Sequence, residues 1–96
     1  MPYIEPDLRR IVDPHIKTLV LASWVGGTDH LRQKRDGVLN YIITRLISCL
    51  YKTSYTDLNA AIGVLECAKQ ELYRRRLAPY ENAKMAENGD VYHDEL

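Results

Sequence analysis

Phenylalanine is absent from this 96-residue chain and tryptophan occurs once, so seven tyrosines carry most of the aromatic content. A tyrosine hydroxyl requires water or a hydrogen-bonding partner, and tyrosine therefore favours half-buried surfaces over a dry core. A chain of this length buries only about 65% of its unfolded surface, which leaves little margin of stability. We therefore expect the protein to complete its core by self-association, as a homo-oligomer.

The chain also lacks a net charge, because thirteen basic residues balance thirteen acidic ones. Without a global positive field it is not expected to attract phosphate backbones, which argues against general nucleic-acid binding. No apolar run is long enough to span a bilayer, and residues 1–14 lack the apolar segment of a signal peptide. We expect a cytoplasmic protein without a membrane segment, in which the C-terminal HDEL is a chance match to a retention signal.

Metal ligands and catalytic nucleophiles are equally scarce. Cys49 and Cys67 lie in apolar helical stretches without CxxC spacing, so we expect buried, reduced thiols. The histidines His15, His30 and His93 lie in three different segments, and none belongs to a Glu-x-x-His motif. The sequence therefore predicts no metal, no cofactor and no enzymatic activity.

Helical periodicity is the strongest positive signal, and it is clearest in residues 54–88. Apolar residues recur there at steps of three and four, which lines one face of an α-helix: Leu58, Ala61, Leu65, Ala68 and Leu72, with Ile62 beside them. Ser54 and Asp57 approximate a capping box at the start, and Asn88-Gly89 should end the helix. Pro79 should kink or restart it, because proline removes a backbone hydrogen bond.

A second helix is predicted near the N-terminus. Asp13-Pro14 is a typical helix start, which leaves residues 1–13 as an extended arm with one helical turn near Asp7. Its apolar face contains Ile16, Leu19 and Val20, and Gly26-Gly27 should end it.

The third helix is predicted over residues 38–51, which are apolar nearly all the way round, as is typical of a central buried helix. The polar residues 28–37 before it are interpreted as a loop, either a solvated connector or a basic rim for an anionic ligand. The short segment 52–54 should make the two long helices antiparallel neighbours. We expect an all-α fold: a small bundle of three main helices over residues 1–88, with a flexible tail at 89–96.

Polar residues beside the apolar stripes form the candidate site. Asn40, Thr44, Ser48 and Lys52 recur every four residues with Arg45 alongside, and Asn59, Gly63, Glu66, Gln70 and Arg74 form a similar row. Convergence of these rows would create a polar pocket that reads a nucleobase edge and binds phosphate. The candidate ligand-binding residues are Asn40, Arg45, Asn59, Glu66 and Arg74. A purely structural alternative, a buried pair of Glu66 with Arg45, remains open.

Two further features of the long helix have alternative explanations. Gly63 in mid-helix costs about 1 kcal/mol relative to alanine, so close helix approach or room for a ligand should compensate. The run Arg74 to Arg76 is either a solvated helix end, with partners in Glu71 or Glu81, or a contact for an anion or another subunit.

Three stretches of the chain resemble a small uncharacterised family of bacteria, archaea and tailed phages: LNYIITRL (39–46), AIGVLECAKQELYRR (61–75) and APYENAKMAENGDVY (78–92). The resemblance covers most of the chain but implies no established activity or catalytic residues. Its phage-borne members imply a class of small viral proteins that counter host immunity, some of which sequester nucleotide signals as compact oligomers.

The leading hypothesis is a non-enzymatic homo-oligomer that binds and sequesters a nucleotide-like signalling molecule, to counter antiviral defence in the host cytoplasm if a phage encodes it. The alternative is an adaptor that docks a host or virion protein through tyrosine-rich helical faces. An enzyme of nucleotide metabolism is disfavoured, because the carboxylate or metal constellation that it needs is missing from the sequence.

Overall fold

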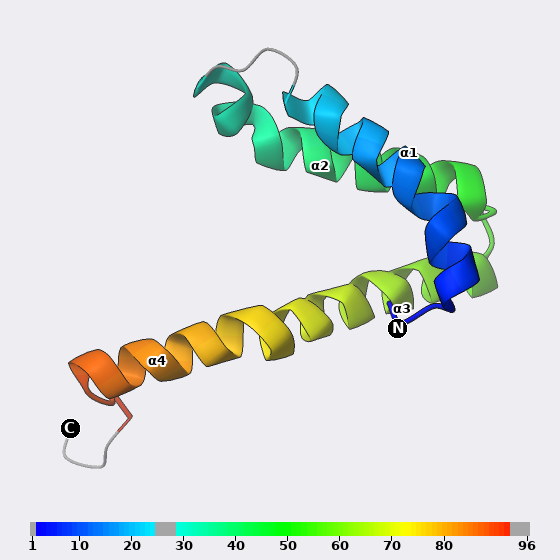
Figure 1. Ribbon diagram of the computed structural model, residues 1–96. Coiled ribbons are helices and arrows are strands. Elements are labelled where there is room, and N and C mark those ends of the chain that lie inside the picture. Colours follow the sequence, from blue (N-terminus) through cyan, green and yellow to red (C-terminus); the bar gives the residue numbers. More distant parts are fainter. Residues whose placement is uncertain (1, 25–28, 93–96) are drawn as a thin grey trace. The chain divides into compact units, whose positions relative to one another are not determined.

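The computed structural model describes residues 2–24 and 29–92 (Figure 1). The elements are α1 (Pro6–Trp24), α2 (Asp29–Leu50), α3 (Tyr55–Leu72), a π-helical turn η1 (Tyr73–Leu77) and α4 (Ala78–Asn88). No strand occurs within the described residues. The predicted all-α fold with three main helices is confirmed, since α3, η1 and α4 together form one helical segment of 34 residues. The single domain over 1–88 and the flexible tail stay predictions.

The chain divides into two units, one of residues 2–61 and one that starts at Ile62. The first unit contains α1, α2 and the start of α3, and the second contains the rest of α3 with η1 and α4.

Helix α1 begins earlier than predicted. Pro6 occupies its first position, where a missing N–H costs nothing, and Asp7 follows in the first turn, where a negative charge is favoured. The Asp7 carboxylate also forms an ion pair with the Arg10 guanidinium, at 2.9 Å. The extended arm expected up to Asp13 is therefore wrong, and Pro14 lies inside the helix. The Pro14 carbonyl accepts a hydrogen bond from the Thr18 hydroxyl at 3.0 Å.

Helix α2 also begins earlier than predicted. Residues 29–37, which we expected to form a loop, are helical, whereas Thr28 and the predicted helix end at Gly26-Gly27 lie outside the described residues. This polar segment is rich in arginine, lysine and glutamine, which have high helix propensity. A polar segment can be helical without an apolar stripe, so the missing periodicity did not exclude a helix here.

The second half of α2 is not the buried helix that its composition predicted. Leu50 is 74% exposed, and Ile42, Ile43 and Ile47 are only half-buried. Helix α1 packs on one side of α2, and one neighbour cannot cover a helix that is apolar all the way round. The predicted burial of the thiols is wrong as well, because Cys49 and Cys67 are both exposed.

The start of α3 confirms half of the predicted capping box. The Asp57 N–H donates to the Ser54 hydroxyl at 3.2 Å, so Ser54 caps the helix as expected. The Asp57 carboxylate does not return the bond to Ser54, since it accepts instead from the backbone N–H of Lys52 at 2.6 Å. The short connection after α2 is thereby tied to the first turn of α3.

The interruption of the helix that we expected at Pro79 is observed as the π turn η1. Proline has no N–H to donate, and its ring crowds the carbonyl four residues earlier, at Arg75. The Ala78 N–H donates to the Tyr73 carbonyl, five residues back, and α4 starts at Ala78 with Pro79 in its first turn. At the other end of α4, Gly89 adopts a φ of 94° and its N–H donates to the Met85 carbonyl at 2.8 Å, which confirms the predicted helix end.

Candidate functional site

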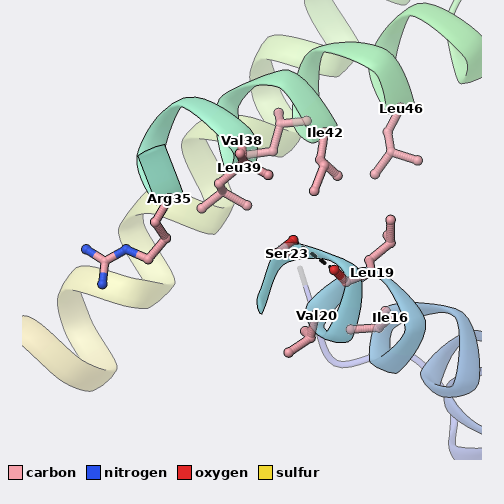
Figure 2. A pocket seen from close by; sticks show the side chains of 10 residues that line it. Ile16, Leu19, Val20, Ser23, Arg35, Val38, Leu39, Ile42 and Leu46 are labelled. Carbon is pink, nitrogen blue, oxygen red and sulfur yellow. Dashed lines mark hydrogen bonds between the residues drawn. The ribbon is translucent and has the colours of Figure 1, made fainter. Parts of the chain in front are cut away.

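Apolar side chains of α1 and α2 line an open groove of about 350 Å³ (Figure 2). It is lined by eight aliphatic residues, one hydroxyl and one guanidinium: Ile16, Leu19, Val20, Val38, Leu39, Ile42, Ile43, Leu46, Ser23 and Arg35. Leu19 and Leu46 point toward one another across it, yet they remain 41% and 48% exposed (Figure 2). The face predicted from Ile16, Leu19 and Val20 therefore exists, but α2 covers only part of it.

The two polar residues of this groove form their hydrogen bonds within their own helices. The Ser23 hydroxyl donates to the Leu19 carbonyl at 2.8 Å, within its own helix (Figure 2). The Arg35 guanidinium points away from the aliphatic side chains and donates to Asp36 at 3.2 Å (Figure 2). An apolar partner surface therefore suits the groove better than a polar ligand does.

A second groove, of about 730 Å³, runs along one face of α3, η1 and α4. Its lining is mixed, with aromatic, aliphatic, amide and charged side chains: Glu66, Lys69, Gln70, Leu72, Tyr73, Arg76, Leu77 and Tyr80. The Lys84 ammonium lies 5.8 Å from the centre of the Tyr80 ring, within the range of a cation–π contact.

The polar row predicted on α2 is present and exposed. The Thr44 hydroxyl donates to the Asn40 carbonyl at 2.8 Å and lies 3.3 Å from the Asn40 side-chain oxygen. The Ser48 hydroxyl donates in the same way to the Thr44 carbonyl at 2.8 Å. Arg45, beside this row, is exposed. This arrangement fits a polar stripe exposed to solvent more closely than a formed ligand pocket.

The candidate residues on the long helix bind neighbours on the same helix. Glu66 accepts from Lys69 at 3.4 Å and from Gln70 at 3.3 Å, and its side chain is half exposed. The buried pair of Glu66 with Arg45, which was our structural alternative, stays a prediction. The Arg74 guanidinium donates to both carboxylate oxygens of Glu71 at 3.0 Å, as the arginine run had suggested.

Asn59 lies exposed in the first unit with Asn40 and Arg45, whereas Glu66 and Arg74 belong to the second. Side chains of one row meet at Asn40 and Thr44 and again at Glu66 and Gln70. Convergence of the five candidates into one pocket stays a prediction.

Sequence reasoning missed the role of Lys69, Arg76 and Leu77 in the second groove. Pro79 indicated that the helix is interrupted here, but the sequence does not give the type of interruption. That type determines which side chains align along the groove. At Gly63 we expected either close helix approach or room for a ligand, and a Cβ built there meets no described atom within 4 Å beyond its own helix backbone.

The described residues contain no group of three or more histidine, cysteine or acidic side chains placed to hold a metal ion. Within the same ranges, no helix is both long and apolar enough to cross a membrane.

Comparison with known proteins finds one family. Its sequence profile, described as a domain of unknown function (DUF6899), matches residues 1–91. No curated protein and no solved structure matches the chain.

Proposed function

Because the chain belongs to a family of unknown function, we infer its role from its exposed surfaces. We propose that it acts as a non-enzymatic homo-oligomer that binds another molecule. The observation that carries this proposal is the lack of burial. Among the residues whose burial is described, Ala61 alone is buried, at 3% exposure.

Enough large hydrophobic side chains are exposed to supply an interface. Twenty-five large hydrophobic side chains of the described residues are at least 41% exposed. A standard interface uses roughly 20–30 residues on each side. Complete burial of one leucine or isoleucine contributes about 1.5–3 kcal/mol, which half-exposed side chains in a lone chain only partly realise. Association between copies supplies the missing burial.

The proposed ligand is a nucleotide-like signalling molecule, held without chemical change. The support comes from the resemblance to phage-borne proteins and from exposed amide, guanidinium and carboxylate groups at Asn40, Arg45, Asn59, Glu66 and Arg74. In an oligomer, helices of different copies adjoin, so these groups can complete one site between subunits. On this proposal the protein lowers the free concentration of a defence signal in the cytoplasm of an infected host.

Native mass spectrometry of freshly purified protein, followed by denaturation and analysis of released small molecules, tests both parts. An oligomer that releases a nucleotide supports the proposal and identifies the ligand class. A monomer refutes self-association. Substitution Arg45→Ala should weaken nucleotide binding while the helical circular dichroism is unchanged, with Lys17→Ala on exposed α1 as the matched control. Equal binding by both variants contradicts the assignment of Arg45.

Exposed tyrosines favour a second candidate, an adaptor that docks a host or virion protein. Tyr41 is 65% exposed and Tyr55 85% exposed, and tyrosine is enriched at protein interfaces. An adaptor forms a complex of fixed stoichiometry with one purified partner and carries no nucleotide. That complex should weaken on Tyr41→Ala or Tyr55→Ala but persist in Arg45→Ala.

A further inference from the structure

We propose that the π turn aligns the apolar residues of α4 with those of α3, and that the resulting face binds a second copy of the chain in antiparallel orientation. This inference rests on the proposed self-association and specifies where and how one contact forms.

The alignment follows from the helical repeat. An α-helix has 3.6 residues per turn, so Leu65 and Leu72, seven residues apart, lie about two turns apart on one stripe. Tyr80 is eight residues beyond Leu72, so an unbroken α-helix would place it about 80° off that stripe. The π turn accommodates one extra residue, because the Ala78 N–H bonds five residues back instead of four. Tyr80 therefore returns to the stripe of Leu65 and Leu72.

The structure shows the aligned face. Leu72, Leu77 and Tyr80 line the same groove, although Leu77 and Tyr80 come after the π turn and Leu72 before it. Pro79 explains why a backbone hydrogen bond is missing here, but it does not explain the alignment of three large apolar side chains. They are 64%, 44% and 59% exposed, so the described residues leave a large part of each side chain uncovered. Single π turns within α-helices occur frequently at functional sites.

The charges beside this face favour a second copy as the occupant. Glu66, Lys69, Glu81 and Lys84 alternate in sign along it. Lys69 and Glu81 lie about three turns apart once the extra residue is discounted, so they share one edge. An antiparallel copy centred on Arg75 places Glu66 opposite the partner's Lys84, and Lys69 opposite the partner's Glu81, each contact occurring twice. A parallel copy in register places this edge of the two copies on opposite sides of the contact, so the opposite charges do not pair.

These four side chains are available for such contacts. Glu66 pairs with Lys69 at 3.4 Å and Lys84 pairs with Glu87 at 3.5 Å, both between solvent-exposed side chains three residues apart. Exposed pairs of this kind contribute little. The same geometry places Tyr73 near the partner's Leu77, so the apolar residues of both copies meet at the centre of the contact.

Removal of the π turn at full chain length tests the alignment. Pro79→Ala restores the missing backbone N–H, and in the uninterrupted α-helix that this favours Tyr80 lies about 80° and Leu77 about 140° off the stripe. We expect the dissociation constant of the oligomer to rise by roughly 100-fold, since two large side chains leave the contact. The control deletes Arg75 in the same Pro79→Ala background, so that Tyr80 is seven residues beyond Leu72 and stays on the stripe, and this variant should associate like the unaltered protein. Sedimentation velocity measures association, and circular dichroism verifies that both variants are helical.

Charge reversal and cross-linking test the orientation. Glu66→Lys with Glu81→Lys should weaken association roughly 30-fold, and further exchange by Lys69→Glu with Lys84→Glu should restore it. In a Cys49→Ser, Cys67→Ser background, Lys69→Cys with Glu81→Cys should yield an intermolecular disulfide that joins positions 69 and 81.

The outcomes separate the two proposals. A monomeric unaltered protein refutes self-association and this inference together. An oligomer that is unaffected by Pro79→Ala, or whose disulfides join only 69 to 69 and 81 to 81, refutes this inference alone.

Discussion

Alanine at Gly63 should stabilise the protein. Gly63 lies inside α3 and Gly37 inside α2, and a Cβ at either position meets no described atom within 4 Å. Alanine removes the entropic cost of a helical glycine without a steric cost, which is worth about 0.5–1 kcal/mol. In a domain of this size, that gain raises the melting temperature by roughly 2–8 °C.

The assay is thermal unfolding by circular dichroism at one fixed protein concentration, because self-association makes the melting temperature concentration-dependent. Gly37→Ala is the matched control, since it makes the same change in another helix. Gly89→Ala is the opposite control: with φ at 94° and ψ at 153°, alanine there costs about 1–3 kcal/mol and should fray the end of α4. A lower melting temperature for Gly63→Ala, with the expected rise for Gly37→Ala, refutes the reasoning and indicates a closely packed partner at Gly63.

Three further substitutions test local features. Ser54→Ala removes the cap of α3 and should lower stability by about 1 kcal/mol, measured by urea unfolding; no change would mean that Asp57 and Lys52 fix this helix start alone. Leu46→Ala in the α1–α2 groove should cost about 2–5 kcal/mol if a second copy fills the groove, and clearly less in a lone chain, where this side chain is half exposed; denaturation at two protein concentrations separates the cases. Glu71→Gln should change stability by less than about 1 kcal/mol, because its ion pair with Arg74 is largely exposed on the arginine side; a larger loss in the same assay would contradict a surface role for this pair.

Local signals in the sequence predicted the parts of the fold that local physics determines. The stripe from Leu58 to Leu72, the cap at Ser54 and the helix end at Gly89 each depend on a few neighbouring residues, and all three are observed. The early starts of α1 and α2 were missed because we required an apolar face to mark a helix. Helix propensity and a well-placed Pro6 suffice without one.

The burial of α2 and the alignment of side chains across η1 could not be predicted from local signals in the sequence. Composition shows that α2 is apolar, but it does not show how many neighbours cover it, and the exposure of Leu50 and Cys49 depends on that number. Pro79 indicated an interruption of the helix, yet a kink, a restart and a π turn are all compatible with its missing N–H. Only the π turn moves Leu77 and Tyr80 onto the face of Leu72.

The hydroxyl groups of the first two helices have a consequence for any surface that covers them. Ser23, Thr44 and Ser48 each donate to the carbonyl four residues earlier, at 2.8 Å. A hydroxyl that loses water on burial normally leaves an unsatisfied donor, which costs about 1–3 kcal/mol. These donors already have acceptors on their own helices. The serine and threonine positions of α1 and α2 can therefore be dehydrated almost as cheaply as alanines, and the surface open to a partner extends beyond the aliphatic residues.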